Sequence, residues 1–483
     1  MRSSKSTKIS SINPKKISAM DIREITDPNR NPAEVIADLK YKTVSVPAWE
    51  ILEKEYDPRK HEVMNNKTYP DKIKKGNTEK VTRFTLALQK LAVKRMGGLM
   101  FTIPVKRIYT PDPDNKDQQA AAKIMESIFK KNRINSVNIE RAKYYNAACE
   151  FVTIWYAQEQ PTIYDKYPSK LKLRCKTYSP MNGDSLYPLF DEYDDLIALS
   201  IEFSRKEGAK TITYFETYTA EEHIRWRIDN EIQEELRQDF ELGKIPGLYQ
   251  SRQEPIWEEQ STNVTDGEWQ LSRNGNYIRK NSRPNWVIYS DNDINKGREP
   301  GANEADRNVL RYGQKDKAEY VTWSQAIESL KFQVDEIKRD FFMMLQLPDM
   351  SMDNMKATPM SGEARKMVFI DAQMKVGSEQ GPWLETFDRE ISVIKAFMKA
   401  MYPNLERAID ELEVESEITA FRINDDKENV EILTNATGGK AIMSQKTAIA
   451  NLGYVDDIEE EMKQIAEESQ VSLYDEPTGG GIE

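Results

Sequence analysis

The chain has 483 residues, of which 39% are hydrophobic and 31% are charged, and its formal net charge at pH 7 is -11. This length exceeds the size at which a single hydrophobic core stops growing, so several substructures are expected rather than one compact enzyme domain. The acidic balance argues against a protein that grips nucleic acid through a broad basic face, and the two cysteines are too few for a disulfide framework or a structural zinc site.

The first part of the chain predicts an arm that leads into a mixed module. Residues 1–45 are polar and irregular, with many Lys, Ser, Asn and Pro, which predicts a flexible N-terminal arm. Between residues 170 and 226, apolar and polar residues alternate in short runs separated by turn residues, as in antiparallel strands. Helical spacing of apolar residues precedes these runs and predicts helices over 77–100 (ending at Gly97-Gly98), 117–131 and 138–150. We therefore expect an α+β module over 46–255.

Two long helices flank a short excursion in the middle of the chain. The first is predicted over 256–284, although Gly267 and Gly275 weaken it. Residues 285–322 break the helical pattern and predict a small β-containing excursion. The second helix is predicted over 323–347, where apolar residues at three-and-four spacing share one face: Ile327, Leu330, Val334, Ile337, Phe341 and Leu345.

A methionine-rich loop separates this helix from the next one. Pro348 ends the helix, and residues 348–361 combine four methionines with polar residues and a second proline, a composition typical of an adaptable loop. Ser361 is a suitable N-cap for a new helix. Downstream we predict long helices over 362–403, further helices with a short strand at 418–421 over 404–470, and a disordered tail over 471–483.

Candidate catalytic residues are few. The only histidines, His61 and His223, lie in unrelated contexts, which argues against a histidine-based triad or metal site. One acidic cluster could hold a hard cation, but a solvated turn between strands explains it better; it consists of Asp191, Glu192, Asp194 and Asp195. No segment approaches the roughly 20 apolar residues of a membrane span. We expect no cofactor, no metal and no membrane contact.

The order of these blocks resembles that of tailed-bacteriophage portal proteins of the siphophage type, the rings through which DNA enters and leaves a capsid. The blocks that carry the resemblance are the helix before Pro348, the methionine-rich loop, the Ser361-Gly362-Glu363-Ala364 step and the C-terminal run over 444–468. The α+β module also closes with Ile245-Pro246, which is similar to the end of the portal wing. No single block is specific, so the inference depends on their order.

The resemblance implies a portal-like α+β fold, in which long helices of a stem and a wing accompany a β-rich wing module and a small β-containing clip. The segments would be a flexible arm (1–45), the wing (46–255), a first stem helix (256–284), the clip (285–322), a second stem helix (323–347), the channel loop (348–361), long wing helices (362–403), a C-terminal wing or crown (404–470) and a disordered tail (471–483).

The resemblance also implies candidate site residues. The channel loop would line the narrow part of the channel and touch DNA loosely through Met350, Met352, Asn354, Met355 and Lys356. The methionines would give a smooth wall, and a lysine contact with phosphate is weak at physiological salt. On the second stem helix, three basic residues could face the channel or form ion pairs between subunits: Lys331, Lys338 and Arg339.

A portal protein would be a non-enzymatic component of the virion at one capsid vertex, assembled in the host cytoplasm. Its partners would be identical subunits in a ring (a dodecamer), the major capsid and scaffold proteins, the terminase motor, the head-to-tail adaptor, and double-stranded DNA that passes without sequence specificity. Two alternatives remain open. One is another multimeric phage structural or scaffold component without a DNA channel, and the other is a metal-dependent nuclease that uses the carboxylates of the acidic cluster.

Overall fold

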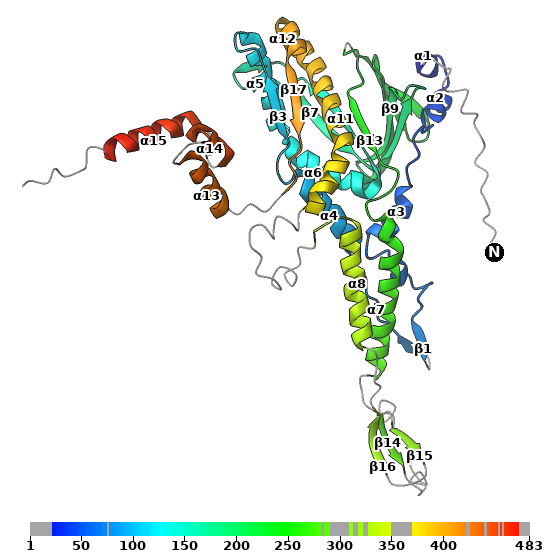
Figure 1. Cartoon of the computed structure of the whole chain (residues 1–483). Helices are drawn as coiled ribbons and strands as arrows, with labels where there is room; N and C mark the ends of the chain where they lie inside the picture. The colour runs from blue at the N-terminus through cyan, green and yellow to red at the C-terminus, as the bar shows by residue number, and fades with distance from the viewer. Residues whose placement is uncertain are drawn as a thin grey trace, which may run out of the picture. The chain divides into compact units, whose positions relative to one another are not determined.

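The structure is a computed structural model that describes residues 22–74, 77–240, 242–281, 285–289, 309–312, 317–321, 327–348, 370–421, 426–438, 442–452, 455 and 458–472. Its contacts divide the chain into two units. One comprises Met1–Asp349 and Asp371–Phe421, and the other comprises Met350–Ile370 and Arg422–Glu483. Helices and strands are mixed along the first unit, so the predicted α+β class is confirmed (Figure 1).

Two antiparallel sheets lie at the centre of the first unit (Figure 1). A three-stranded sheet has the order β13-β4-β7, and a five-stranded meander has the order β12-β11-β10-β9-β8. Their strands are β4 (Glu150–Gln158), β7 (Lys172–Tyr178), β8 (Ser185–Phe190), β9 (Leu196–Glu207), β10 (Lys210–Tyr218), β11 (Glu222–Ile228), β12 (Ile232–Asp239) and β13 (Gly247–Ser251). Strands are thus found where the alternation between 170 and 226 predicts them.

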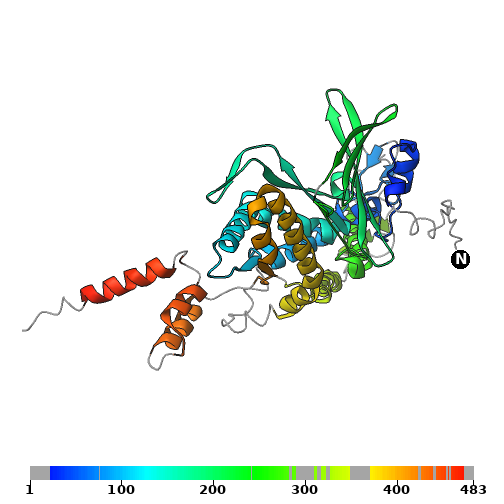
Figure 2. The ribbon, with the colours of Figure 1, turned by 90° about the horizontal axis from the view of Figure 1, so that it is seen from above.

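The two sheets pack face to face, and helices cover their outer faces (Figure 2). Alternate residues of one strand belong to different cores, because successive side chains point to opposite faces. In β4, Val152 and Ile154 face the five-stranded sheet, whereas Trp155 packs among the helices. The helices on that side include α5 (Lys116–Lys131), α11 (Ile370–Met401) and α12 (Glu406–Glu411). The first unit is therefore layered as helices, sheet, sheet and helices.

The outermost layer corrects the prediction of a flexible arm over 1–45. Residues 22–39 contain α1 (Ile22–Ile25) and α2 (Pro32–Leu39), whose apolar side chains are buried against the outer face of the five-stranded sheet. The Asn31 side chain caps α2 by accepting a hydrogen bond from the Ala33 amide (3.0 Å), and Pro32 occupies the first helical turn, where no amide donor is needed. The polar residues thus mark a helix start. Residues 1–21 lie outside the described part of the chain.

Two further boundaries differ from the predictions. The helix expected over 77–100 is α4 (Leu88–Phe101), preceded by β2 (Asn77–Glu79), and Gly97-Gly98 lies inside it because Gly97 faces Ala142 of α6 (Ile134–Ala148). The strand expected at 418–421 is β17 (Glu413–Glu417), which pairs with β3 (Lys106–Thr110). The smaller elements are α3 (Trp49–Tyr56), η2 (Glu62–Met64), β1 (Lys72–Lys74), β5 (Thr162–Tyr164), β6 (Tyr167–Ser169), η3 (Pro180–Asn182), η4 (Glu258–Gln260) and η5 (Pro403–Leu405).

The middle of the chain contains the expected helix, strands and helix. Helix α7 (Ser261–Asn281) precedes and α8 (Ile327–Met344) follows a sheet of order β15-β14-β16, formed by β14 (Asn285–Tyr289), β15 (Val309–Tyr312) and β16 (Lys317–Val321). Strand β14 pairs parallel with β15 and antiparallel with β16. In the second unit, the C-terminal helices are α13 (Asp426–Thr437), α14 (Gln445–Leu452) and α15 (Ile458–Ser472). Across the described residues, no helix is both long and apolar enough for a membrane span.

A buried carboxylate on α11 joins the helical layer to the three-stranded sheet. Glu390 is fully buried and accepts hydrogen bonds from Arg141 of α6 (2.7 Å) and from the Trp155 indole of β4 (3.2 Å). Arg107 of β3 is 3.4 Å from its second oxygen, and burial lowers the pKa of that guanidinium. A buried charge is tolerated only when it is paired and hydrogen-bonded, so these contacts fix α11 on the sheet.

Candidate channel segment and its anchors

Helices α7 and α8 pack side by side along their apolar faces (Figure 1). A β-carbon on Gly267 of α7 would lie 3.0 Å from Cδ1 of Ile337, so the missing side chain allows α8 to approach closely. On α8, Phe341 and Leu345 are buried. Val334 and Ile337 are half-buried, so the stripe predicted from spacing is confirmed for the side chains that are described. Gly267 therefore serves helix packing rather than interrupting α7.

An extended segment before α4 lies along α7 and is held by regularly spaced hydrogen bonds. The amides of Thr82, Phe84 and Leu86 donate to the side chains of Asn276 (2.7 Å), Ser272 (2.8 Å) and Glu268 (2.6 Å). Two residues of extended chain advance about 6.6 Å, and four residues of helix advance about 6 Å, so the two spacings match. Beside this ladder, Gly275 leaves room for the Phe84 ring.

Helix α8 ends in a Schellman motif, two residues before the proline that the sequence predicts as its stop. Gln346 has a left-handed backbone (φ 54°), the Leu347 amide donates to the Phe342 carbonyl (2.9 Å), and the Gln346 amide donates to the Met343 carbonyl (3.0 Å). Leu347 and Phe342 are buried, as the apolar contact of this motif requires. The start of the candidate channel loop is thus set by the backbone before Pro348 is reached.

An arginine of α4 holds the chain where it leaves this motif. The Arg95 guanidinium donates to the Pro348 carbonyl (2.8 Å) and lies 4.0 Å from the centre of the Phe342 ring. A planar guanidinium can stack on a ring while its N–H groups donate in its own plane, which an ammonium cannot do. Arg95 therefore links the last turn of α8 to α4.

A second arginine holds α11 at Glu379, nine residues after its first residue. Glu379 is paired with Lys375 on its own helix (3.2 Å) and lies 3.6 Å from Arg252, which follows β13. Arg252 also donates to the Asn146 side chain of α6 (2.8 Å). Charged side chains of the first unit thus hold Pro348, which precedes the segment between Pro348 and Ile370, and Glu379, which lies nine residues beyond it in α11.

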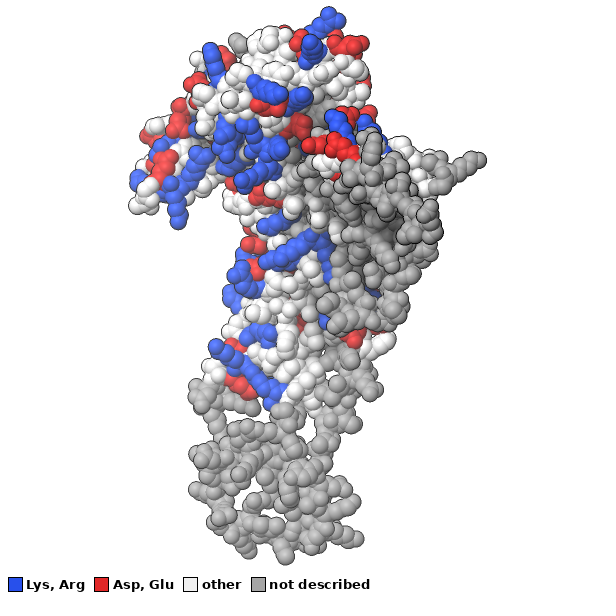
Figure 3. All heavy atoms as spheres, turned by 90° about the vertical axis from the view of Figure 1, so that its left-hand side faces the viewer, with Lys and Arg blue, Asp and Glu red and all other residues white. Residues whose placement is uncertain are grey.

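The residues predicted to form the channel surface are only partly described. Met350, Met352, Asn354, Met355 and Lys356 lie outside the described residues, as does the side chain of Lys331. Lys338 is exposed on α8, and Arg339 is exposed and paired with Glu336 of the same helix. Figure 3 shows basic side chains at several places on one face, with acidic side chains near most of them. The predicted roles of these residues stay predictions.

The acidic cluster forms the turn between β8 and β9. The Asp191 carboxylate accepts hydrogen bonds from the amides of Tyr193 (2.8 Å) and Asp195 (2.9 Å), which is how an aspartate closes a turn. Asp194 has a left-handed backbone (φ 63°). Within the described ranges, no group of three or more His, Cys, Asp or Glu side chains could hold a metal ion.

The sequence of the chain matches one known protein family over most of its length. The family model of phage portal proteins described as SPP1 Gp6-like matches residues 42–472. The chain belongs to this portal family. A portal protein is a structural, non-enzymatic component of the virion at the capsid vertex, so the class of function and the location predicted from the sequence are confirmed.

Curated proteins gave no match to this portal chain. Solved structures did. A chain in the neck of a native gene transfer agent particle is 8% identical, with a TM-score of 0.37, covering 86% of this chain and 95% of that chain. A chain in the neck of an empty particle is 8% identical, with a TM-score of 0.39 and coverages of 76% and 88%. A chain in the virion of the native gene transfer agent particle is 8% identical, with a TM-score of 0.37, covering 87% of this chain and 98% of that chain.

The anchoring residues of this portal protein were not found from its sequence. Arg95 and Arg252 give no local signal, because each lies in an ordinary helical or strand-end context and its partners are more than 100 residues away. The sequence does contain a signal for the hydrogen bonds between α7 and the extended segment before α4. Glu268, Ser272 and Asn276 form a polar stripe at four-residue spacing, but the stripe does not show which segment it binds.

Proposed function

We propose that identical copies of this portal protein close into a ring, a dodecamer, whose channel carries double-stranded DNA into the capsid and out of it. The observation that carries the proposal is the family match over 431 consecutive residues, 42 to 472. In this ring α7 and α8 form the stem, residues 285–322 the clip, and residues 348–361 the channel loop. The predicted loop residues then touch DNA loosely, in keeping with the acidic net charge.

The outer face of α8 supports contact between neighbouring subunits. Phe332 and Met343 are 67% and 56% exposed, and eleven residues of helix bring them to nearly the same face. Arg339 and Glu336 form an ion pair between them on that face. Large apolar side chains that flank a charged pair are typical of a surface that a partner covers. A cyclic ring supplies such a partner through a different face of the next subunit.

The wing and the clip have further roles in this proposal. The clip docks the terminase motor during packaging and the head-to-tail adaptor afterwards. The wing contacts the major capsid and scaffold proteins. The start of the channel loop suits this arrangement, because Arg95 of α4 holds the Pro348 carbonyl at a fixed place in each subunit.

Electron microscopy of negatively stained full-length protein tests the ring. We expect closed rings with a central hole, and a packaging assay with the virus's own motor should then depend on them. Phe332→Glu should leave single subunits or open arcs and package no DNA, because it places a charge in the interface. Gln333→Glu, an exposed neighbour on a different face, should behave as the native protein. A native chain that stays monomeric over a wide range of salt and concentration contradicts the proposal.

A further inference from the structure

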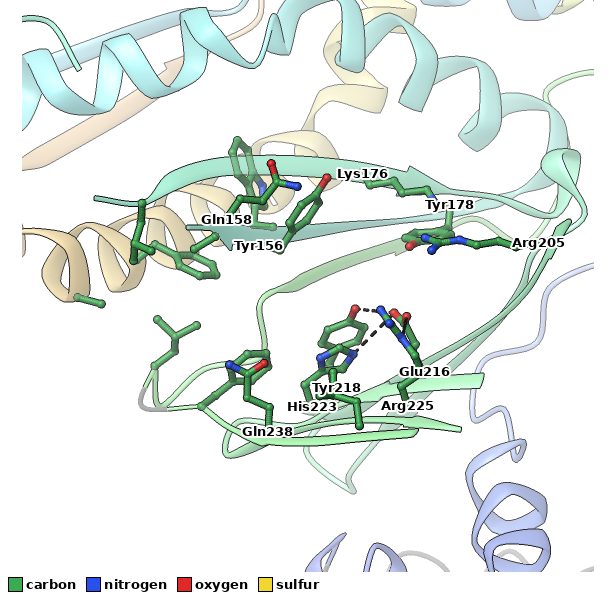
Figure 4. A pocket seen from close by; sticks show the side chains of 18 residues that line it. Tyr156, Gln158, Lys176, Tyr178, Arg205, Glu216, Tyr218, His223, Arg225 and Gln238 are labelled. Atoms are coloured by element: carbon green, nitrogen blue, oxygen red, sulfur yellow. Dashed lines mark hydrogen bonds and ion pairs between the residues drawn. The ribbon is translucent and has the colours of Figure 1, made fainter. Parts of the chain in front are cut away.

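A pocket of about 590 Å³ lies between the two sheets of the wing, apart from the candidate channel segment. Figure 4 shows its two walls. Tyr156, Gln158, Lys176 and Tyr178 come from β4 and β7 of the three-stranded sheet, and the opposite wall comes from β10, β11 and β12. Phe397 and Ala400, at the end of α11, also line it. The volume lies within the range of pockets that bind ligands.

One end of the pocket carries two cations that form no salt bridge with a described side chain, although the carboxylates of Asp184 and Glu216 act on Lys176 at longer range. Lys176 and Arg205 lie 5.2 Å and 5.0 Å from the centre of the same ring, that of Phe203. Burial and the neighbouring Arg205 lower the pKa of Lys176. Over the described ranges, neither cation forms a salt bridge. Two like charges held together beside aromatic rings are an anion-binding arrangement.

The centre of the pocket holds the Glu216 carboxylate, which accepts hydrogen bonds from two side chains and lies near the His223 ring. Glu216 accepts hydrogen bonds from Arg225 (2.6 Å) and from the Tyr218 hydroxyl (2.7 Å). Nε2 of His223 is buried and lies 3.7 Å from the same carboxylate, too far for a hydrogen bond but close enough for an ion pair when the ring is protonated. Its ring stacks on Tyr218 at 4.3 Å. A ligand in the pocket can therefore pair with Lys176 and Arg205, while the Glu216 carboxylate is already engaged by its neighbours.

The other end of the pocket is apolar, with amide side chains between it and the cations. The apolar lining residues are Trp155, Leu171, Leu236, Phe240, Leu242 and Phe397. Gln158 and Gln238 lie on opposite walls (Figure 4). A glutamine side chain both donates and accepts, which suits it to a peptide group.

We propose that this pocket binds an acidic peptide segment of a partner protein, with a carboxylate between Lys176 and Arg205 and an apolar side chain at the end formed by Phe240, Leu242 and Phe397. The spacing of cations, amides and apolar surface follows the order of groups along such a segment. A nucleotide would satisfy the cations, but its sugar and base edges would lose hydrogen bonds with water at the apolar end. The proposal does not depend on ring formation, because every residue named belongs to one wing.

Selection from a library of displayed random short peptides, on the purified full-length protein, tests this site. We expect the selected peptides to combine acidic with aromatic or aliphatic residues. Arg205→Glu should weaken binding of a selected peptide roughly tenfold or more, because it turns an attraction into a repulsion. Lys206→Glu is the matched control, since it makes the same charge change on the next residue of β9, which faces away from the pocket.

The outcomes separate the site from its alternatives. Selected peptides that are acidic, and that bind the Lys206→Glu protein but not the Arg205→Glu protein, support it. Selection of basic peptides, or equal binding to both variants, overturns it. Binding of adenosine monophosphate that Arg205→Glu abolishes, together with failure to select any peptide, also overturns it in favour of a nucleotide. Thermal unfolding of both variants shows that each is folded when binding is measured.

Discussion

Gly275 shows how one missing side chain determines the packing of α7. A β-carbon there would lie 2.5 Å from the Phe84 ring and 2.9 Å from the Thr82 methyl group. We predict that Gly275→Ala lowers the free energy of unfolding by about 1–3 kcal/mol, because the extended segment must move away from the helix. Gly377→Ala is the control. It adds a β-carbon in open space within α11 and should raise stability by about 0.5–1 kcal/mol. Urea unfolding measures both, and equal effects would contradict the packing role.

Glu216 gives the wing a defined acid sensitivity. Burial opposes its ionisation, but His223, the Tyr218 hydroxyl and Arg225 outweigh burial and lower its pKa from 4.5 to about 2. The stabilisation is present above about pH 4.5 and is lost as the pH falls towards 2. We predict that Glu216→Gln lowers the free energy of unfolding by about 3 kcal/mol at neutral pH, and that this loss becomes smaller as the pH falls from 4.5 towards 2.

Urea unfolding at several pH values measures this loss. The exposed control Glu235→Gln should change the free energy of unfolding by less than about 0.5 kcal/mol. A difference that does not depend on pH would refute the role of this carboxylate.

At the scale of elements, the backbone at the end of α8 is slightly strained at Gln346. Gln346 adopts a left-handed conformation that glycine adopts at little cost. Gln346→Gly should therefore raise the free energy of unfolding by up to about 1 kcal/mol. The same change at Gln333, exposed inside α8, should lower it by about 1 kcal/mol. Thermal unfolding compares the two variants. If both changes destabilise the protein, the Schellman motif is not what ends the helix.

Elements with a clear period were predictable, whereas elements that depend on distant partners were not. Alternation locates the strands of the two sheets, and three-and-four spacing locates α8 and its buried face. Helix α2 was not predicted, because the polar, proline-containing composition of residues 1–45 favours a flexible arm, although Asn31-Pro32 is a helix start when Val35, Ile36 and Leu39 follow. Glycine lowers helix propensity locally, but only the fold shows that Gly267 and Gly275 each face a side chain from another segment.

At the scale of the whole molecule, the order of blocks identifies the family where no single motif does. The portal match covers residues 42–472, and the blocks that carried the resemblance, from Ile245-Pro246 to residue 468, lie within that stretch. The candidate site was less predictable. The inter-sheet pocket takes its lining from both sheets and from α11, so no local pattern contains it. The contacts that hold Pro348 and Glu379 likewise combine residues that only the folded chain brings together.

The buried Glu390 has a consequence for how the protein is made. Its partners Arg141 and Trp155 precede it by 249 and 235 residues. At the usual speed of a ribosome, roughly 10–50 s pass between the synthesis of Arg141 and that of its carboxylate partner. During that time the Arg141 guanidinium can bond to Asn138 and Thr153 but lacks the carboxylate that balances its charge, so its burial beneath the helical layer is unfavourable. A chain truncated before residue 390 lacks this carboxylate permanently, and we expect its helical layer to pack poorly on the sheet.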